Sequence, residues 1–329
     1  MLMNYSIILG NLGNTCDRFL SSGYKEELDK DTMLKQASQI NRVKGIELVG
    51  TWDIDEANVR EMKQKLDDHE LKCVSIIPDL FSRKKWGSGS FASADRDIRR
   101  AAVAEVNICT DMAVEMNCDL LNIWPGQDGY DYALCADYME ERQWFAEGIR
   151  ESAIYAAKKG VRFALEYKLK EPRTHSYLAR AADTIVLLQE LNMDNVGACI
   201  DTGHAFAAYE NVADSIASFK MAGDKLFHMH YNDNYSAWDD DMIVGSLRLT
   251  EFFEILYWLK KTNYAGWHSM DQYPYREDGY GAIKSSVLYL QKLEAILESA
   301  GMAEVEELIK KRDPIATSEF IRNNLINSP

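Results

Sequence analysis

Ala198-Cys-Ile-Asp-Thr-Gly-His204 is a short apolar run that ends on a carboxylate, Asp201, and then turns at a glycine. Three other short apolar runs in the second half of the chain close on an acidic or imidazole side chain in the same way. The four closing residues are Glu166, Asp201, His230 and Asp271. Ends of successive parallel strands meet at one mouth of a barrel, so we expect these side chains to converge. Three carboxylates and one imidazole favour Mn²⁺, Mg²⁺ or Co²⁺ over zinc, and the sequence predicts a divalent-metal site.

Short apolar runs and longer amphipathic runs alternate along the whole chain. The strand-like runs span residues 5–12, 45–50, 71–78, 119–125, 161–168, 196–201, 226–232 and 266–272. The helix-like runs span residues 31–42, 56–69, 93–116, 132–159, 177–191, 212–222, 250–262 and 281–299. Eight strands alternating with eight helices predict an α/β fold, a closed (β/α)₈ TIM barrel, over residues 1–301, with a C-terminal helical tail over residues 302–329. An open doubly wound sheet is disfavoured, because Gly10-Asn-Leu-Gly13 is too short for a dinucleotide loop.

The composition limits the classes of partner. With 329 residues and 47% hydrophobic content, the chain can bury one large core. The net charge of −15 argues against nucleic acid and against an anionic membrane surface, because both attract basic proteins. The six cysteines show no paired spacing and no apolar run approaches a membrane span, so we expect a cytoplasmic protein with reduced thiols.

The run that closes on Glu166 continues to Lys168, two residues further on. Side chains alternate along a strand, so Glu166 and Lys168 face the same way. The carboxylate can then hold a metal while the ammonium binds an oxygen of the substrate. The competing interpretation is a surface ion pair, which the apolar residues 163–165 disfavour.

Two histidines lie on one face of the predicted strand at residues 226–232. His230 is nearer the C-terminal end of this strand, so we take it as the metal ligand. His228 is then interpreted as a residue of a second layer or of the core.

Two further groups suggest a second metal ion. After Asp201 the glycine permits a tight turn that returns His204 toward the same mouth, so that Asp201 can serve both ions. Asp239 and Asp241 are alternate members of an acidic triplet that a second divalent ion would neutralise. The alternatives are that His204 caps the following helix and that the triplet is a solvated loop.

Aromatic residues follow three of the predicted strands. Trp52 follows the second strand, Phe81 the third, and Trp124 closes the fourth. An aromatic wall beside a metal suits the apolar face of a sugar, although each of these residues could equally pack in the core.

Taken together, these blocks resemble the sugar isomerases of the xylose isomerase-like barrels, and most nearly bacterial L-rhamnose isomerases. Residues 166–172, Glu-Tyr-Lys-Leu-Lys-Glu-Pro, are similar to the Glu-Tyr-Lys-Pro-x-Glu-Pro block of those enzymes. Residues 201–204 are similar to their Asp-Leu-Gly-His turn. Residues 230–233, with the acidic triplet and Gly245, are similar to their His-x-Asn-Asp segment, and residues 270–272 to their Ile-Asp-Gln triplet. Residues 79–100 look more like xylose isomerase, and the resemblance covers roughly residues 45–275.

The resemblance implies a reaction and a set of roles. The reaction is aldose–ketose interconversion of a monosaccharide by a metal-assisted hydride shift between C1 and C2. One ion would be held by Glu166, Asp201, His230 and Asp271, and the catalytic ion by His204, Asp239 and Asp241. Lys168 would bind the carbonyl-end oxygen and Trp124 would line the pocket; from the aromatic wall described above we expect Trp52 and Phe81 to line it too. We expect two divalent ions per subunit, with Mn²⁺ preferred to Mg²⁺ and Co²⁺, catalytic roles for Lys168, Asp239 and Asp271, and a homodimer or homotetramer.

One position departs from the pattern. Those isomerases carry a histidine at the end of the second strand that assists opening of the sugar ring, whereas here residues 47–53 contain none and Val49 occupies the equivalent place. Asp53 is the candidate to substitute as the acid–base group. The gap favours substrates that open readily or are already open-chain.

Three alternatives stay open. A ketose 3-epimerase on the same barrel would use one metal and a pair of glutamates to pass a proton across C3, but the residue at the eighth strand is Asp271. A non-catalytic sugar- or partner-binding barrel is supported by the missing histidine and opposed by the complete ligand set. An endonuclease of abasic DNA is disfavoured by the charge.

Overall fold

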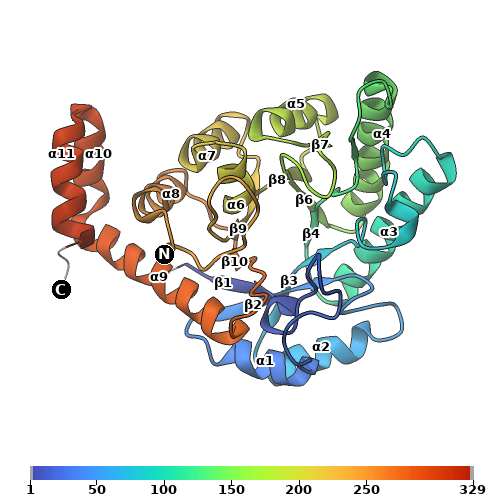
Figure 1. Cartoon of the computed structure of the whole chain (residues 1–329), viewed down its shortest axis with the longest axis horizontal. Coiled ribbons are helices and arrows are strands. Elements are labelled where there is room, and N and C mark those ends of the chain that lie inside the picture. The colour runs from blue at the N-terminus through green and yellow to red at the C-terminus, as the bar shows by residue number, and fades with distance from the viewer. Residues whose placement is uncertain (1–2, 327–329) are drawn as a thin grey trace.

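Eight parallel strands close into a barrel, and helices surround it (Figure 1). The computed structural model describes residues 3–326. Around the barrel the strands follow in the order β1, β10, β9, β8, β6, β4, β3 and β2, so each predicted strand pairs with its neighbours along the chain. The predicted (β/α)₈ barrel is therefore confirmed.

The barrel strands are β1 (Tyr5–Ile8), β2 (Val43–Val49), β3 (Lys72–Ile77), β4 (Leu120–Ile123), β6 (Arg162–Glu166), β8 (Val196–Asp201), β9 (Leu226–Tyr231) and β10 (His268–Met270). A separate antiparallel pair, β5 (Gly129–Tyr130) and β7 (His175–Ser176), joins the loops that follow β4 and β6. The longer helices are α1 (Lys30–Ser38), α2 (Val59–Asp68), α3 (Arg96–Glu115), α4 (Tyr138–Ala157), α5 (Ala181–Leu191), α7 (Val212–Met221), α8 (Leu249–Lys261) and α9 (Gly279–Ala300).

Several short elements were not predicted from the sequence. The first strand ends at Ile8 and continues as a 3₁₀ turn, η1 (Leu9–Leu12), and a second 3₁₀ turn, η2, spans Lys84–Trp86. The short helix α6 (Thr202–Ala207) begins directly after β8, because the Asp201 carboxylate accepts a hydrogen bond from the His204 N–H at 2.8 Å. Asp201 is therefore the residue that caps this helix, in the manner usual for an N-cap aspartate.

The strand register brings the predicted site residues to one level. Asp201 on β8 lies opposite His230 on β9, and His230 lies opposite Ser269 on β10. The Asp271 N–H then donates to the Tyr231 carbonyl at 3.2 Å, which fixes the residue that follows β10. The carboxyl ends of these strands therefore place their last side chains beside one another.

The end of the chain extends away from the barrel (Figure 1). After α9 come α10 (Met302–Lys311), α11 (Pro314–Ile321) and a final turn, η3 (Arg322–Ile326). Phe320 of α11 is buried against Phe253 of α8, with ring centroids 5.8 Å apart. The predicted tail at residues 302–329 includes residues 327–329, which lie outside the described residues. Among residues 3–326, no helix is long and apolar enough to cross a bilayer.

Candidate metal centre

Four groups of side chains among the described residues could each hold a cation, and two of them, which overlap, consist entirely of residues predicted from the sequence. In each group the candidate ligand atoms all lie within 4.8 Å of one another. The first group consists of Glu166, Asp201, His230 and Asp271, and the second of Asp201, His204 and Asp239. The structure thus brings together the four strand-end residues predicted from the sequence, and Asp201 belongs to both groups.

In the first group the imidazole of His230 presents its Nδ1 atom to two carboxylates. Nδ1 lies 3.0 Å from Asp271 Oδ2 and 3.5 Å from Glu166 Oε2. The atom is buried, yet it makes no hydrogen bond to any residue in the described part of the chain. One imidazole nitrogen and two carboxylates thus point toward one another. Together they form the donor set expected of a divalent ion.

In the second group the imidazole of His204 presents its other nitrogen. His204 Nε2 lies 3.1 Å from Asp239 Oδ2, while Nδ1 lies 3.0 Å from the Tyr167 carbonyl oxygen. A carbonyl only accepts, so Nδ1 carries a proton, and Nε2 is the nitrogen whose lone pair a cation beside Asp239 would take. Asp239 Oδ1 is buried and makes no hydrogen bond within residues 3–326. Both groups therefore contain a buried atom for which a cation would be the missing partner.

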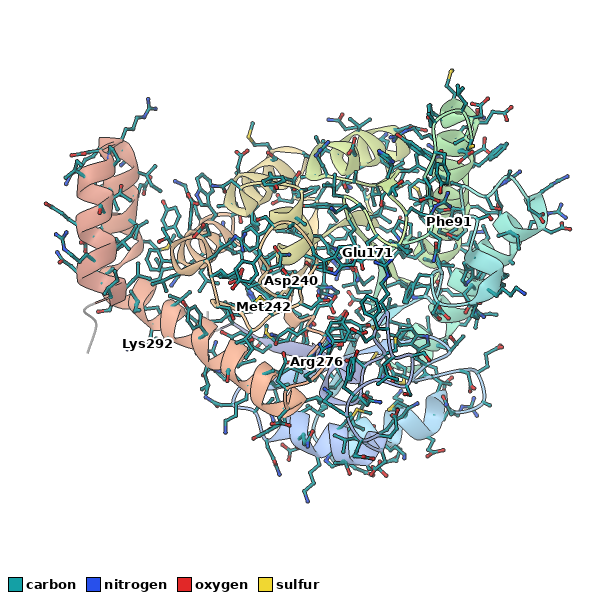
Figure 2. All side chains as sticks on the ribbon, in the orientation of Figure 1. Phe91, Glu171, Asp240, Met242, Arg276 and Lys292 are labelled. Atoms are coloured by element: carbon teal, nitrogen blue, oxygen red, sulfur yellow. The ribbon has the colours of Figure 1, made fainter. Side chains whose placement is uncertain are left out.

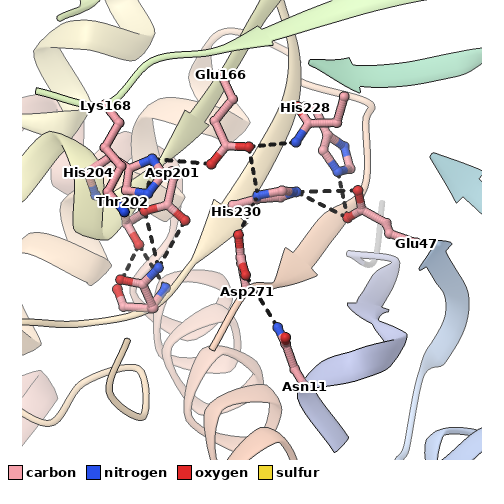
Figure 3. A network of polar contacts seen from close by, with 12 residues as sticks. Asn11, Glu47, Glu166, Lys168, Asp201, Thr202, His204, His228, His230 and Asp271 are labelled. Carbon is pink, nitrogen blue, oxygen red and sulfur yellow. Dashed lines mark hydrogen bonds and ion pairs between the residues drawn. The ribbon is translucent and has the colours of Figure 1, made fainter. Parts of the chain in front are cut away.

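Asparagine side chains, among them Asn11 in Figure 3, orient the carboxylates, and they were not predicted from the sequence. Asn122 Nδ2 donates to Glu166 Oε2 at 2.6 Å, and Asn11 Nδ2 donates to Asp271 Oδ1 at 3.3 Å. Asn232 Nδ2 donates to both oxygens of Asp201, at 2.9 and 3.1 Å. Such outer hydrogen bonds fix the direction in which ligand oxygens point.

The electrostatics of the site favour a cation. One lysine, Lys168, lines the cavity beside the two ligand groups. The carboxylates of these groups and of the neighbouring cavity wall are those of Glu166, Asp201, Asp239, Asp241 and Asp271. Burial raises the pKa of Asp201 to about 7, and the charges of Asp239 and Asp271 act in the same direction. Burial and the same two neighbours also raise the pKa of Asp241 well above its usual range. Bound divalent cations would offset this repulsion.

Lys168 lies between two of the acidic residues. Its Nζ atom is 2.8 Å from Asp239 Oδ2 and 3.0 Å from Glu171 Oε2, and it lies over the Trp124 ring at 5.2 Å from the centroid. Burial alone would lower the pKa of Lys168, but Asp239 and Glu171 outweigh burial and hold the pKa well above its usual range. The ammonium is therefore charged and held in place.

A cavity of about 310 Å³ adjoins these groups. Its polar lining is formed by Gln127, Glu166, Lys168, Glu171, His204, Asp239, Asp241 and Asp271, and its remaining lining by Ile8, Val49, Ile77, Phe81, Trp124, Pro172, Tyr273 and Tyr275. In Figure 2, Glu171, Asp240 and Met242 lie near the centre of the view, inside the ring of helices. A cavity of this size, half apolar and with convergent polar groups, suits a small ligand.

Three predicted residues differ in placement from the rest. Asp241 lines the cavity but belongs to neither metal group. Trp52 is 43% exposed and does not line the cavity, because its indole N–H donates to Ser82 Oγ at 3.0 Å. Asp53 does not line it either, since its Oδ2 atom turns back to accept the Val49 N–H at 2.9 Å. Phe81 and Trp124, by contrast, lie on the cavity wall with ring centroids 4.7 Å apart.

Comparison with known proteins agrees with this architecture. Residues 34–293, most of the chain, match the family described as xylose isomerase-like TIM barrel, and the chain belongs to that family. It is 28% identical over 263 residues to the xylose isomerase of Thermus thermophilus, a match that covers 76% of this chain and 67% of that enzyme. It is 27% identical over 270 residues to the xylose isomerase of Thermus caldophilus, covering 78% of this chain and 70% of that enzyme.

Solved structures share the fold. A D-tagatose 3-epimerase-like protein superposes with a TM-score of 0.71 at 19% identity, covering 91% of this chain and all of that one. An L-ribulose 3-epimerase superposes with a TM-score of 0.69 at 16% identity, covering 92% and 98% of the two chains. The narrower resemblance to rhamnose isomerases stays a prediction.

Proposed function

We propose that this protein is a metal-dependent aldose–ketose isomerase that moves a hydride between C1 and C2 of a monosaccharide. The observation that carries the proposal is the pair of ligand groups that share Asp201 and stand, with Lys168, beside one cavity. The xylose isomerases of the two Thermus species support the same class of reaction.

The ligand groups define which residues would hold metal. Glu166, Asp201, His230 and Asp271 would hold one ion, and Asp201, His204 and Asp239, with Asp241 beside them, a second. We propose Mn²⁺ for both positions, because hard oxygen donors outnumber imidazoles in each group. When bound, two such ions polarise the neighbouring oxygens of the carbons between which the hydride moves.

Lys168 would orient the substrate. Its ammonium is charged, buried and already held by Asp239 and Glu171, so it can donate a hydrogen bond to the carbonyl-end oxygen at little cost in side-chain entropy. Trp124 beneath the lysine offers a flat apolar surface to the sugar. The remaining wall, formed by Ile8, Val49 and Ile77, keeps water from the carbons that exchange hydride.

The same apolar wall bears on the choice of substrate. Val49 offers no acid–base group for ring opening, and Asp53 faces the backbone. We therefore propose substrates that open readily, or whose terminal carbon lacks a hydroxyl, of the kind that a rhamnose-type isomerase would accept. We further propose a cytoplasmic homodimer or homotetramer, with the barrel at residues 1–301 and the tail after it.

The test is a screen of aldoses and ketoses, deoxy and branched sugars included, with Mn²⁺ or Co²⁺ added to metal-stripped protein. Product chromatography should show an aldose–ketose pair interconverting only with metal. A run in deuterated water should leave the product free of carbon-bound deuterium, as a hydride shift requires. Glu166→Gln is the control, which should neither bind metal nor turn over. Full turnover by metal-stripped protein would contradict the proposal.

The second candidate is a ketose 3-epimerase, which the names of the superposing structures favour. Two carboxylates, Glu166 and Asp271, face the cavity and could pass a proton across one carbon. This reaction would place solvent deuterium at C3, so the deuterated-water experiment separates the two candidates.

A further inference from the structure

Glu47 lies at the centre of the barrel and contacts two histidines. It is fully buried on β2, and its carboxylate lies 2.8 Å from His228 Nε2 and 3.3 Å from His230 Nε2 (Figure 3). Both histidines are on β9, which β1 and β10 separate from β2 around the barrel. The contacts therefore cross the barrel interior, on the side of His230 that faces away from Asp271.

We propose that Glu47 is a positioning residue that keeps the His230 proton on Nε2 and so leaves the Nδ1 lone pair for the metal. The proposal rests on the metal centre of the proposed function and adds a residue to it. An ionised carboxylate can only accept, so each imidazole nitrogen that faces Glu47 must carry a hydrogen. The other nitrogen, His230 Nδ1, faces the carboxylates of Asp271 and Glu166, so a cation held by those carboxylates would take the Nδ1 lone pair in place of a proton.

Two donors face the buried Glu47 carboxylate, the Nε2 atoms of His228 and His230. A buried carboxylate with only one donor would lose much of its stabilisation. Asp271 faces Nδ1 and would favour the other tautomer of His230, with the proton on that nitrogen. Its side chain is, however, 15% exposed, and it also accepts a hydrogen bond from the Asn11 amide. A proton on Nε2 of His230, facing Glu47, is therefore the more stabilising of the two arrangements.

His228 completes the arrangement from the other side of Glu47. Its ring lies 5.0 Å from the His230 ring at an interplanar angle of 76°, so the two imidazoles approach the same carboxylate from different directions. His204 is oriented in the complementary way. The Tyr167 carbonyl accepts the hydrogen on Nδ1, which leaves Nε2 as the nitrogen that would bind a cation in the second ligand group. The two metal groups thus use opposite imidazole nitrogens, each selected by the atom behind the ring.

A purely structural role for Glu47 makes different predictions from a positioning role. Glu47→Gln keeps the shape and removes the charge, and its amide offers one acceptor and one donor group to two imidazoles. If Glu47 only fills the core, this variant loses thermal stability and binds metal normally well below its melting temperature. If Glu47 positions His230, the affinity for metal falls although the protein is folded.

The experiment measures Mn²⁺ binding to metal-stripped protein by titration calorimetry, with no sugar present. We expect Glu47→Gln to raise the Mn²⁺ dissociation constant by roughly 10- to 100-fold, the effect typical of a lost outer hydrogen bond to a metal ligand. Glu294→Gln is the matched control, because Glu294 is also a buried glutamate. Its hydrogen-bond partners are Arg42, at 2.6 Å, and the Met3 N–H rather than a residue of either ligand group. Its Mn²⁺ affinity should match that of the unaltered protein.

A second measurement does not depend on how the variant folds. In ¹⁵N-histidine-labelled protein loaded with diamagnetic Mg²⁺, nitrogen shifts report which nitrogen of each of the six histidines carries hydrogen. We expect hydrogen on Nε2 of His230. Hydrogen on Nδ1 of His230, or an Mn²⁺ affinity unchanged in folded Glu47→Gln, would overturn the inference. Metal binding that depends on Glu47 without any sugar turnover would leave the inference intact and remove the isomerase proposal.

Discussion

Gly203 is the residue whose substitution tests the metal centre most directly. A Cβ atom at this position would lie 1.8 Å from Asn232 Oδ1 and 2.8 Å from its Cγ, so Asn232 must move in Gly203→Ala. The Asn232 backbone cannot follow easily, because Thr202 Oγ1 donates to its carbonyl at 2.7 Å and accepts its N–H at 3.0 Å. The side chain has to rotate, and its two hydrogen bonds to Asp201 are lost.

The magnitude follows from those two hydrogen bonds. A hydrogen bond to a charged group contributes about 2 kcal/mol, and loss of the Asn232 amide from Asp201 should cost at least one such contribution. Because about 1.4 kcal/mol is a factor of ten, Mn²⁺ should bind roughly 30-fold more weakly to Gly203→Ala. Asp201 belongs to both ligand groups, so both binding steps should weaken.

The assay is Mn²⁺ titration of metal-stripped protein, with circular dichroism to verify the fold. Gly87→Ala is the control, since a Cβ there meets only the Lys84 carbonyl at an ordinary 3.4 Å. Unchanged Mn²⁺ affinity in folded Gly203→Ala would refute the reasoning, because it would mean that the Asn232 contact with Asp201 has no bearing on cation binding.

The remaining predictions concern single residues. Asp271→Asn should abolish binding at the first metal group and turnover with it, and full activity of this variant after metal removal would exclude the assignment. Lys168→Met should keep its metal content while its kcat falls by at least tenfold, since the lysine orients substrate; steady-state kinetics beside metal analysis decides this. His268 has its pKa lowered from 6.5 to about 3, chiefly by burial and further by the positive charge of Arg42. Between these pH values His268 binds a proton in the unfolded chain but not in the folded chain. The free energy of unfolding therefore decreases as the pH falls below 6.5, by about 3 kcal/mol at about pH 4.5. Denaturant unfolding of His268→Gln should show an acid-induced loss smaller by this amount, and an identical loss would show that His268 accepts a proton in the fold.

The fold could be predicted because buried parallel strands are apolar on both faces, whereas the helices between them are apolar on one face only. That contrast located every barrel strand, and it gave β8 as residues 196–201 with both ends correct. It failed at the end of β1, where the apolar run continues beyond the strand. β1 stops at Ile8 although Leu9 and Leu12 are apolar and buried, because the chain turns there into η1.

The site could be predicted where position along a strand determines position in the barrel. Glu166, Asp201 and His230 each end or nearly end a strand, so the fold alone brings them together. Asp53 shows the limit of this argument, since it follows β2 closely in sequence. Thr51 takes a positive φ of 70° in the intervening turn, which directs the Asp53 carboxylate back to the Val49 N–H.

The residues that hydrogen-bond to the candidate ligands could not be predicted in this way, because no sequence pattern marks them. Glu47 contacts His228, which lies 181 residues further along the chain. From the sequence alone, a glutamate inside an apolar strand could equally lie on an exposed face of that strand. Five of the six residues in the two ligand groups have such an anchor from another element: Asn122 for Glu166, Asn232 for Asp201, Asn11 for Asp271, Glu47 for His230 and the Tyr167 carbonyl for His204. Because the anchors hold the ligand atoms in place through the protein alone, a cation would meet a site that needs little rearrangement. The affinity for metal should therefore depend on residues that never touch it, which is why the Asn232 and Glu47 contacts are the decisive ones to break.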